Sequence, residues 1–210
     1  MTYSNQAAMF ERPERYRRIE SASKYDHHLS RPDMVRRMSR AAEMAAFKRS
    51  IGRVTGQSVL DAPCGTGRLH SILNGKFPEV ASLDSSLAML TVYENKHLQT
   101  ELFCGDIFNL PFHRGEWDWV VCYRLFHHFK ADSDRVHLLK SISRVCRKGV
   151  VFSAWLDTPI NRRRGSRRSS ISRQSLERTI EKSGLELLSL DFAAWPFQPK
   201  CVVTCKRPLR

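Results

Sequence analysis

The segment VLDAPCGTGRL (residues 59–69) decides the fold class, because it joins a strand, a glycine-containing loop and a helix. The apolar run at 58–62 predicts a buried strand, and a helix is predicted over 68–73. Between them, Gly65 and Gly67 let the backbone approach a ligand, and the helix start presents free N–H groups. This order predicts the ligand-binding turn of an open α/β sheet.

Three acidic residues, Asp61, Asp84 and Asp106, stand at the ends of three successive predicted strands. Asp84 comes 23 positions after Asp61, near the spacing of about 20 residues at which an acid holds ribose hydroxyls. Three carboxylates at one sheet edge disfavour a phosphate-rich ligand and favour hydroxyls, amines or positive charge. His70 stands where the dinucleotide fingerprint G-x-G-x-x-G needs its third glycine, which argues against NAD.

Strand-like and helix-like segments alternate through the middle of the chain, which predicts a parallel sheet covered on both faces. Further strands are predicted at 79–84, 100–104, 117–123 and 149–155, and helices from Ser85 and over 133–146, the latter with a stripe of Val136, Leu139, Lys140, Ile142, Ser143 and Cys146. Near the C-terminus, Ser172 is a predicted N-cap and Gly184 a predicted helix stop. Strands at 185–194 and 200–205 are predicted to pair antiparallel across a short turn.

One domain preceded by an extension is the predicted organisation. Residues 1–30 are polar and charged without a sustained period, and we expect them to be mobile. The domain over 31–210 is expected to begin with a helix at 31–51 and to have its ligand-binding core at 55–155. Residues 156–210 are expected to supply a substrate-side loop, a helix and the last two strands.

Composition limits the classes of protein that fit. The chain has 210 residues, of which 41% are hydrophobic, so it can bury a core. No apolar run approaches the roughly 20 residues that span a bilayer, and no signal peptide is evident at the N-terminus. The six cysteines lack metal-ligand spacing, so no metal site is expected. Buried free thiols in a reducing cytoplasm are the interpretation we favour.

Positive charge is concentrated at the two ends of the chain. The net charge is +14, with +5 in residues 1–50, +2 in residues 51–149 and +7 in residues 150–210. Such a distribution concerns binding partners rather than the fold.

Four segments in order, VLDAPCGTGRL, ASLDSSLAML, CGDIFNLPF and WDWVVCYRLFHHF, resemble the ordered motifs of class I S-adenosylmethionine-dependent methyltransferases. The resemblance covers roughly residues 55–155, and the tail is compatible with the family's sixth and seventh strands. It implies a Rossmann-like α/β fold, in which a seven-stranded, mostly parallel sheet has helices on both faces and an antiparallel C-terminal strand. It also implies S-adenosyl-L-methionine as the cofactor.

The same resemblance implies roles for individual residues. Asp61, Gly65 and Gly67 would surround the methionine half of the cofactor. Asp84 would hold the ribose hydroxyls, and Asp106 with its neighbour would flank the adenine. The full expected cofactor-binding set is Asp61, Ala62, Pro63, Cys64, Gly65, Gly67, Asp84, Ser85, Asp106, Ile107 and Tyr123. Met89 is expected either near the cofactor or in the core.

Pro63 departs from the family's usual loop, which has glycine at that position. Proline fixes φ near −65° and removes an N–H donor. The proline-cysteine version of the loop is similar to that of bacterial members of the family that are of the small-molecule type. We therefore expect the loop to bind the cofactor despite Pro63. Cys64 is expected to offer backbone contacts rather than a nucleophile.

Methyl transfer from a sulfonium is an in-line displacement, so alignment supplies much of the acceleration. A general base is needed only where the acceptor must lose a proton. His127 and His128 are the candidates, with packing and solvation as the alternative roles. Tyr123 and Arg124, closer to the strand end, are candidates for contacts with the cofactor and with an acidic substrate group.

The basic ends flank the region where this family places its acceptor, so a small or lipid-linked, anionic acceptor is expected. Five arginines fall within residues 162–168, and Arg162, Arg163 and Arg164 are the substrate-side candidates. An RNA methyltransferase is the first alternative, supported by charge but by no appended RNA-binding module. A non-catalytic protein that keeps cofactor binding is the second. Peripheral contact with a membrane, the acceptor atom and the oligomeric state stay open.

Overall fold

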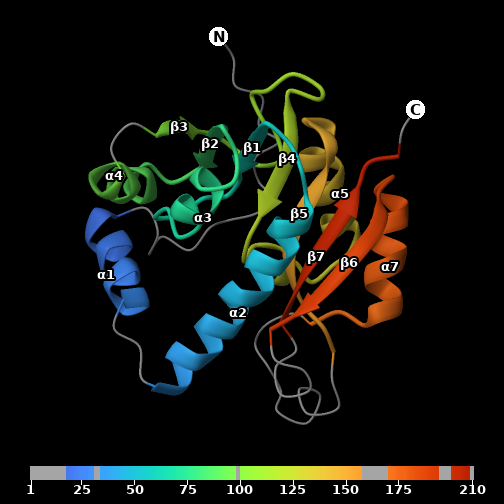
Figure 1. Ribbon diagram of the computed structural model, residues 1–210, viewed down its shortest axis with the longest axis horizontal. Coiled ribbons are helices and arrows are strands. Elements are labelled where there is room, and N and C mark those ends of the chain that lie inside the picture. The colour runs from blue at the N-terminus through green and yellow to red at the C-terminus, as the bar shows by residue number, and fades with distance from the viewer. Residues whose placement is uncertain (1–17, 31–33, 98–99, 158–169, 194–199, 209–210) are drawn as a thin grey trace.

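One seven-stranded sheet runs through the protein in the order β3-β2-β1-β4-β5-β7-β6 (Figure 1). The computed structural model describes residues 18–30, 34–97, 100–157, 170–193 and 200–208. The strands are β1 (Ser58–Asp61), β2 (Glu79–Asp84), β3 (Glu101–Cys104), β4 (Trp117–Cys122), β5 (Cys146–Trp155), β6 (Glu186–Phe192) and β7 (Lys200–Lys206). The helices are α1 (Ile19–Ser30), α2 (Met34–Arg53), α3 (His70–Asn74), α4 (Leu87–Lys96), the 3-10 helix η3 (Phe126–His128), α5 (Asp132–Arg144) and α7 (Arg173–Lys182).

The strand order reverses direction between β1 and β4. β1 pairs in parallel with β2 on one side and with β4 on the other, and β4 pairs in parallel with β5. β7 is antiparallel to both β5 and β6. The predicted Rossmann-like sheet with an antiparallel C-terminal strand is therefore confirmed, and its crevice lies at the carboxyl ends of β1 and β4.

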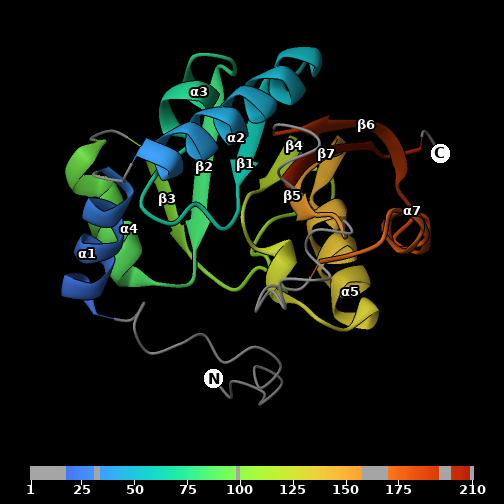
Figure 2. The ribbon, with the colours of Figure 1, turned by 90° about the horizontal axis from the view of Figure 1, so that it is seen from below.

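Both faces of the sheet are buried, which explains the continuous apolar runs of the central strands. Successive residues of β1 point to opposite faces, so Leu60 joins one core cluster and Val59 the other. Figure 2 shows α2 and α3 on one face of the sheet and α5 and α7 on the other. The cluster under α5 and α7 contains Leu138, Leu139, Ile142, Leu176 and Ile180.

The predicted stripe of the helix at 133–146 is partly wrong. Leu139 and Ile142 are fully buried, as expected, but Lys140 is exposed, and Leu138 takes part in the core instead. The helix ends at Arg144 because Cys146 already begins β5. Among the cysteines, Cys104 is exposed at the end of edge strand β3, and the other five are buried free thiols.

The N-terminal extension is not wholly without structure, because Ile19–Ser30 forms α1. Its Ala22 is completely buried and packs with Ala88 and Met89 of α4. One small buried residue gives no apolar period along the chain, so the sequence pattern did not indicate this helix. The predicted start of the next helix at 31–33 lies outside the described residues, and α2 is described from Met34. No helix in the described part of the chain is long and apolar enough to cross a membrane.

Candidate active site

Asp61 ends β1 at the crevice and is almost completely buried. Neither of its carboxylate oxygens has a hydrogen-bond partner among the described residues. Burial, and then the negative charge of nearby Asp84, raise the pKa of the Asp61 carboxyl well above its usual range. Since buried carboxylates are normally hydrogen-bonded, this position fits a ligand that brings its own donors.

Asp84 ends β2 and has the opposite surroundings. Its Oδ2 accepts the Gly65 N–H at 3.0 Å, and its Oδ1 accepts the Ser86 N–H at 2.9 Å. The carboxylate thereby fixes the glycine loop against the end of β2 and against the start of α4, where Ser86 is the N-cap. A helix was predicted from Ser85, and Ser85 itself is exposed before the helix begins. The ribose-binding role of Asp84 stays a prediction.

The two loop glycines serve different purposes. Both have positive φ, +57° at Gly65 and +80° at Gly67. A Cβ added at Gly65 would meet nothing within 4 Å, so this part of the loop faces open space. A Cβ at Gly67 would lie 2.6 Å from a ring carbon of Tyr93, so Gly67 is already required by packing within the protein.

The rest of the expected loop residues are arranged around this turn. Ala62 is buried and Pro63 is partly exposed, and the peptide bond between them is cis. The Cys64 N–H donates to the Leu83 carbonyl at 2.9 Å, which attaches the loop to β2. The Cys64 side chain is buried in a small apolar cluster with Leu90 and Tyr93 of α4.

The residues expected near the adenine are only partly available to a ligand. Asp106 is exposed just beyond β3, and its Oδ1 accepts the Phe108 N–H at 3.0 Å. The Ile107 side chain belongs to the core, and its carbonyl accepts the Ser141 hydroxyl at 2.6 Å. Met89 is buried against α1, the core alternative of the two roles considered for it.

The end of β4 carries an unusual backbone at Arg124, whose φ is +62°. Few residues other than glycine adopt this conformation, and those that do are concentrated at functional sites. The Arg124 N–H donates to the Ser153 hydroxyl at 2.6 Å. Beside it, the buried Tyr123 hydroxyl donates to Glu43 at 3.5 Å, and the Arg68 guanidinium lies 5.8 Å from the Tyr123 ring. Burial, and then the charge of Glu43, raise the pKa of Tyr123.

The two candidate bases lie side by side in η3 with different exposure. His127 is buried, and its ring lies 5.3 Å from the Trp155 ring at the end of β5. His128 is exposed, with its ring 4.3 Å from that of His127. The structure thus brings His127, rather than His128, toward the carboxyl end of β5.

A polar cluster beside these residues has no counterpart in the sequence pattern. Glu43 of α2 is buried and forms an ion pair with the partly buried Lys200, the first residue of β7. Lys200 Nζ also donates to the Ser39 hydroxyl at 3.1 Å and lies 5.1 Å from the centre of the Trp155 ring. The hollow at this edge is lined by Glu43, Tyr123, Arg124, Ser153, Ala154, Trp155, Ala193, Lys200, Cys201 and Val202.

Glu43 and Lys200 are 157 positions apart, so no local motif could connect them. The one available signal was an acidic residue on the mostly apolar buried side of α2, near Ala46 and Phe47. Arg162, Arg163 and Arg164 lie outside the described residues.

A family model described as a methyltransferase domain matches residues 59–149, which include β1, β2, β3 and β4 with their loops. Residues 59–149 thus match a methyltransferase domain, in agreement with the resemblance of the sequence motifs to the class I S-adenosylmethionine-dependent methyltransferases. Asp61, Asp84 and the Gly65 loop lie at the carboxyl ends of β1 and β2, the edge at which open α/β sheets bind their ligands.

Proteins similar to this chain are found among both sequences and structures. Demethylmenaquinone methyltransferase from Thermotoga maritima is 35% identical over 116 residues, which are 54% of this chain and 49% of the relative. The chain thus matches about half the length of that relative. Magnesium protoporphyrin IX methyltransferase from Synechocystis, solved with bound SAH, is 15% identical with a TM-score of 0.70, over 89% of this chain and 95% of the other. A methyltransferase from Clostridium acetobutylicum is 18% identical with a TM-score of 0.67, over 88% of this chain and 98% of the other.

Proposed function

We propose that this chain transfers a methyl group from S-adenosyl-L-methionine to a small or lipid-linked, anionic acceptor. The observation that carries the proposal is the Asp61 carboxylate, which is buried at the crevice without a donor. The α-ammonium group of the cofactor would supply that donor and a compensating positive charge. The open space above Gly65 would admit the cofactor's methionine half to the loop.

Other residues of the chain would complete the cofactor site. Asp84 would orient the loop through Gly65 and accept ribose hydroxyls. Asp106, exposed beyond β3, and the backbone beside it would flank the adenine. When bound, the cofactor supplies the activated methyl group, so the chain's own contribution is alignment and exclusion of water.

The acceptor would bind at the carboxyl ends of β4 and β5. Aromatic Tyr123 and Trp155 and cationic Arg124 line the hollow there, where Lys200 is already paired with Glu43. Aromatic faces and a cation together suit an acceptor with a flat ring system and an acidic group. The names of the T. maritima relative and the Synechocystis neighbour, which specify small-molecule acceptors, support this class over RNA.

His127 is the residue that we propose as general base for an acceptor that must lose a proton. Its position next to Trp155, which lines the hollow, supports this role. Replacing His127 with Gln should lower kcat by about 10²–10⁴-fold while leaving cofactor affinity unchanged. A kcat that stays near the wild-type value would assign His127 to packing.

Calorimetric titration of the cofactor tests the proposed site. Asp61→Ala should weaken binding of S-adenosyl-L-methionine by about 10–100-fold, because it removes a charged hydrogen-bond acceptor worth about 1.5–3 kcal/mol. Glu79→Gln, which changes an exposed acid at the start of β2, is the matched control and should bind like the wild type. Absence of binding by the wild type at millimolar cofactor would reject the methyltransferase proposal.

A turnover screen separates the remaining alternatives once binding is seen. Labelled methyl donor should be offered with phenols, carboxylates, lipid extracts and RNA. Turnover on RNA alone would favour the RNA methyltransferase. Binding without turnover on any acceptor would favour a non-catalytic binding protein.

A further inference from the structure

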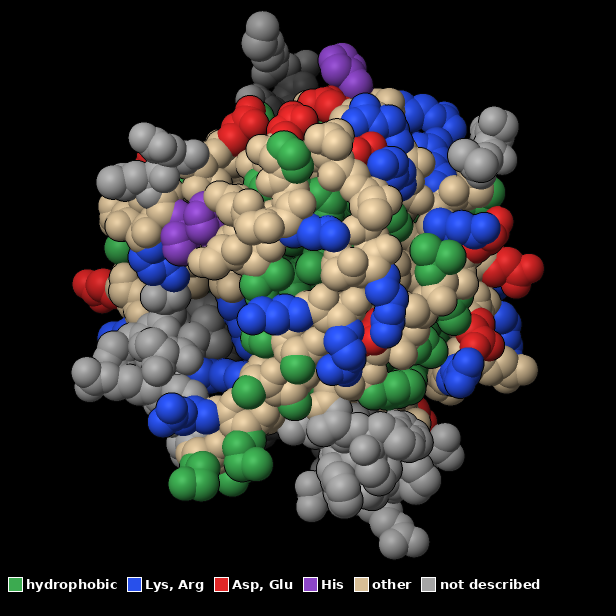
Figure 3. All heavy atoms as spheres, in the orientation of Figure 1, with side chains coloured by type: hydrophobic (Ala, Val, Ile, Leu, Met, Phe, Trp, Pro, Cys, Tyr) green, Lys and Arg blue, Asp and Glu red, His purple; other side chains and the backbone are tan. Residues whose placement is uncertain are grey.

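A second hollow lies at the opposite edge of the sheet from Asp61, where β4 and β5 begin and β7 ends. This cleft of about 370 Å³ is lined by Arg114, Lys140, Ser143, Arg144, Ser183, Gly184, Arg207 and Pro208. Four of these eight described residues are cationic and none is acidic. Figure 3 shows Lys and Arg side chains gathered at this end of the molecule, near the ends of α5 and β7.

Backbone carbonyl groups hold two of the four cations in fixed positions. Arg144 donates to the Leu110 carbonyl at 2.6 Å and to the Phe112 carbonyl at 2.9 Å. Arg207 donates to the Cys146 carbonyl at 2.6 Å. A guanidinium has five N–H donors, so these bonds orient each group and leave donors for a ligand.

The side chains of the other two cations, Arg114 and Lys140, form no hydrogen bond or ion pair with any described residue and are exposed. Lys140 stands four positions before Arg144 on α5, a spacing at which like charges repel. Gly184 has a φ of +72°, and a Cβ there would meet nothing within 4 Å, so the cleft stays open beside it. Four cations around one open hollow favour an anionic occupant.

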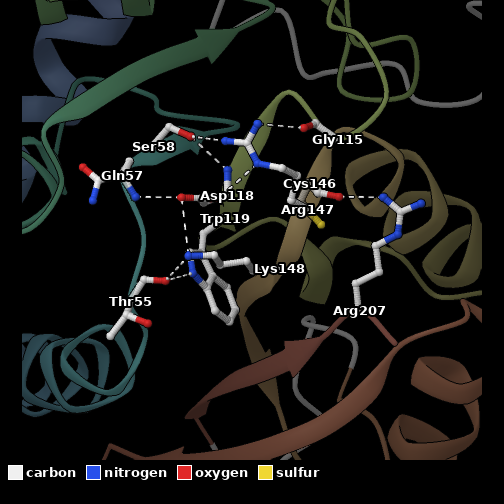
Figure 4. Close-up of polar contacts among 10 residues, drawn as sticks. All are labelled: Thr55, Gln57, Ser58, Gly115, Asp118, Trp119, Cys146, Arg147, Lys148 and Arg207. Carbon is white, nitrogen blue, oxygen red and sulfur yellow. Dashed lines mark hydrogen bonds and ion pairs between the residues drawn. The ribbon is translucent and has the colours of Figure 1, made fainter. Parts of the chain in front are cut away.

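The neighbouring cations on β5 provide a contrast, because both lie beside a carboxylate (Figure 4). Arg147 Nε donates to Asp118 Oδ1 at 3.0 Å, and Lys148 Nζ lies 3.6 Å from Asp118 Oδ2. Asp118 is not among the residues that line the cleft. Arg147 and Lys148 therefore share one acid, whereas no acid is among the described residues that line the cleft.

We propose that this cleft binds clustered phosphate groups at a site separate from the cofactor site. Guanidinium groups bind phosphate with paired N–H donors, and ammonium binds it as a point charge. The cleft volume lies within the range of about 300–1,000 Å³ typical of ligand sites. A small polyphosphate compound and a nucleic-acid backbone share this chemistry. The proposal holds whether or not the chain transfers methyl groups.

Titration with two probes tests the cleft and separates the two sources of phosphate. Sodium tripolyphosphate is titrated by calorimetry, and a short fluorescent single-stranded RNA by anisotropy, both at about 0.15 M salt. The double variant Arg114→Ser/Lys140→Ser should weaken binding at least about ten-fold and reduce the salt dependence of RNA binding by about two charges. Lys24→Ser/Arg37→Ser removes the same charge from exposed positions on α1 and α2 and should change binding by less than about two-fold.

Each outcome decides the proposal. Loss of tripolyphosphate binding in the cleft variant supports a small polyphosphate ligand, and loss confined to RNA supports a nucleic-acid backbone. No binding of either probe to the wild type, or an equal loss in both double variants, would overturn the proposal. Lys140→Gln, a single exposed change, gives the same test if the double variant fails to fold.

Discussion

Two buried carboxylates at the crevice, Asp61 and Asp84, differ in their hydrogen bonds. Asp84 accepts two backbone N–H groups, whereas Asp61 accepts none from the described residues. The raised pKa of Asp61 means that its contribution to stability is present below pH 4 and is lost as the pH rises through the folded-state pKa. Asp61→Asn should therefore increase the free energy of unfolding at pH 7 by about 1–3 kcal/mol and leave it nearly unchanged at pH 4. Urea denaturation at both pH values measures this, and a variant that is less stable than the wild type at pH 7 would contradict it.

The loop glycines allow stability and cofactor binding to be separated at single residues. Gly67→Ala should lower the free energy of unfolding by about 1–3 kcal/mol, because its Cβ would overlap the Tyr93 ring. Gly65→Ala should cost only about 1–2 kcal/mol of backbone strain while its methyl group enters the cofactor space. Urea denaturation measures the loss of stability in each variant, and calorimetry measures the loss of cofactor affinity. Relative to its loss of unfolding free energy, Gly65→Ala should lose more cofactor affinity than Gly67→Ala. The reverse order would place the ligand on the Gly67 side.

At the scale of elements, Asp118 connects the starts of β1, β4 and β5. Burial alone would raise its pKa, but the Gln57 N–H, Arg147 and Lys148 together lower it. Stability from this carboxylate is therefore present above pH 4 and is lost as the pH falls through the lowered pKa. Asp118→Asn should cost about 1–3 kcal/mol at pH 7 and less at pH 2, as measured by urea denaturation. A cost that is independent of pH would show that the amide loses packing rather than charge.

The positions of the strands along the chain were predictable because their apolar runs and the glycines and acids at their ends are local signals. The strand 79–84 was predicted with its observed bounds, and Ser172 is the N-cap of α7 as expected. Helix α1 was not predictable, because its burial rests on Ala22 against α4 rather than on its own sequence period. Cys104 is exposed, although its segment predicted a buried strand, because β3 lies at the edge of the sheet.

The proposed cofactor side of the site was more predictable than the proposed acceptor side. Asp61, Gly65 and Asp84 are found together at the crevice because consecutive parallel strands place their ends at one edge. Lys200 reaches the same edge only because β7 runs antiparallel, and Glu43 only because α2 crosses that face. Such contacts depend on the tertiary fold, which the spacing of residues does not encode.

Across the whole molecule, the Asp61 crevice and the phosphate cleft lie at opposite edges of one sheet. Sites that share no residues and no mobile element should bind independently. Saturating S-adenosylhomocysteine should therefore leave the tripolyphosphate affinity unchanged within about two-fold, and Arg114→Ser/Lys140→Ser should leave the cofactor affinity unchanged. Reciprocal calorimetric titrations measure both, and a change of more than about five-fold in either direction would indicate coupling between the edges.

The direction of β7 also determines how the protein is best handled in experiments. Because this strand runs from the proposed acceptor side to the opposite edge, Pro208 leaves the sheet beside the cationic cleft. An affinity tag or surface linker joined after it would leave the proposed cofactor site near Asp61 open to solution. The same tag would crowd the cleft, and a polyhistidine sequence would add its own metal-binding and cationic groups there. Immobilisation through the C-terminus therefore suits cofactor assays, whereas the tag should be cleaved off before phosphate-binding assays.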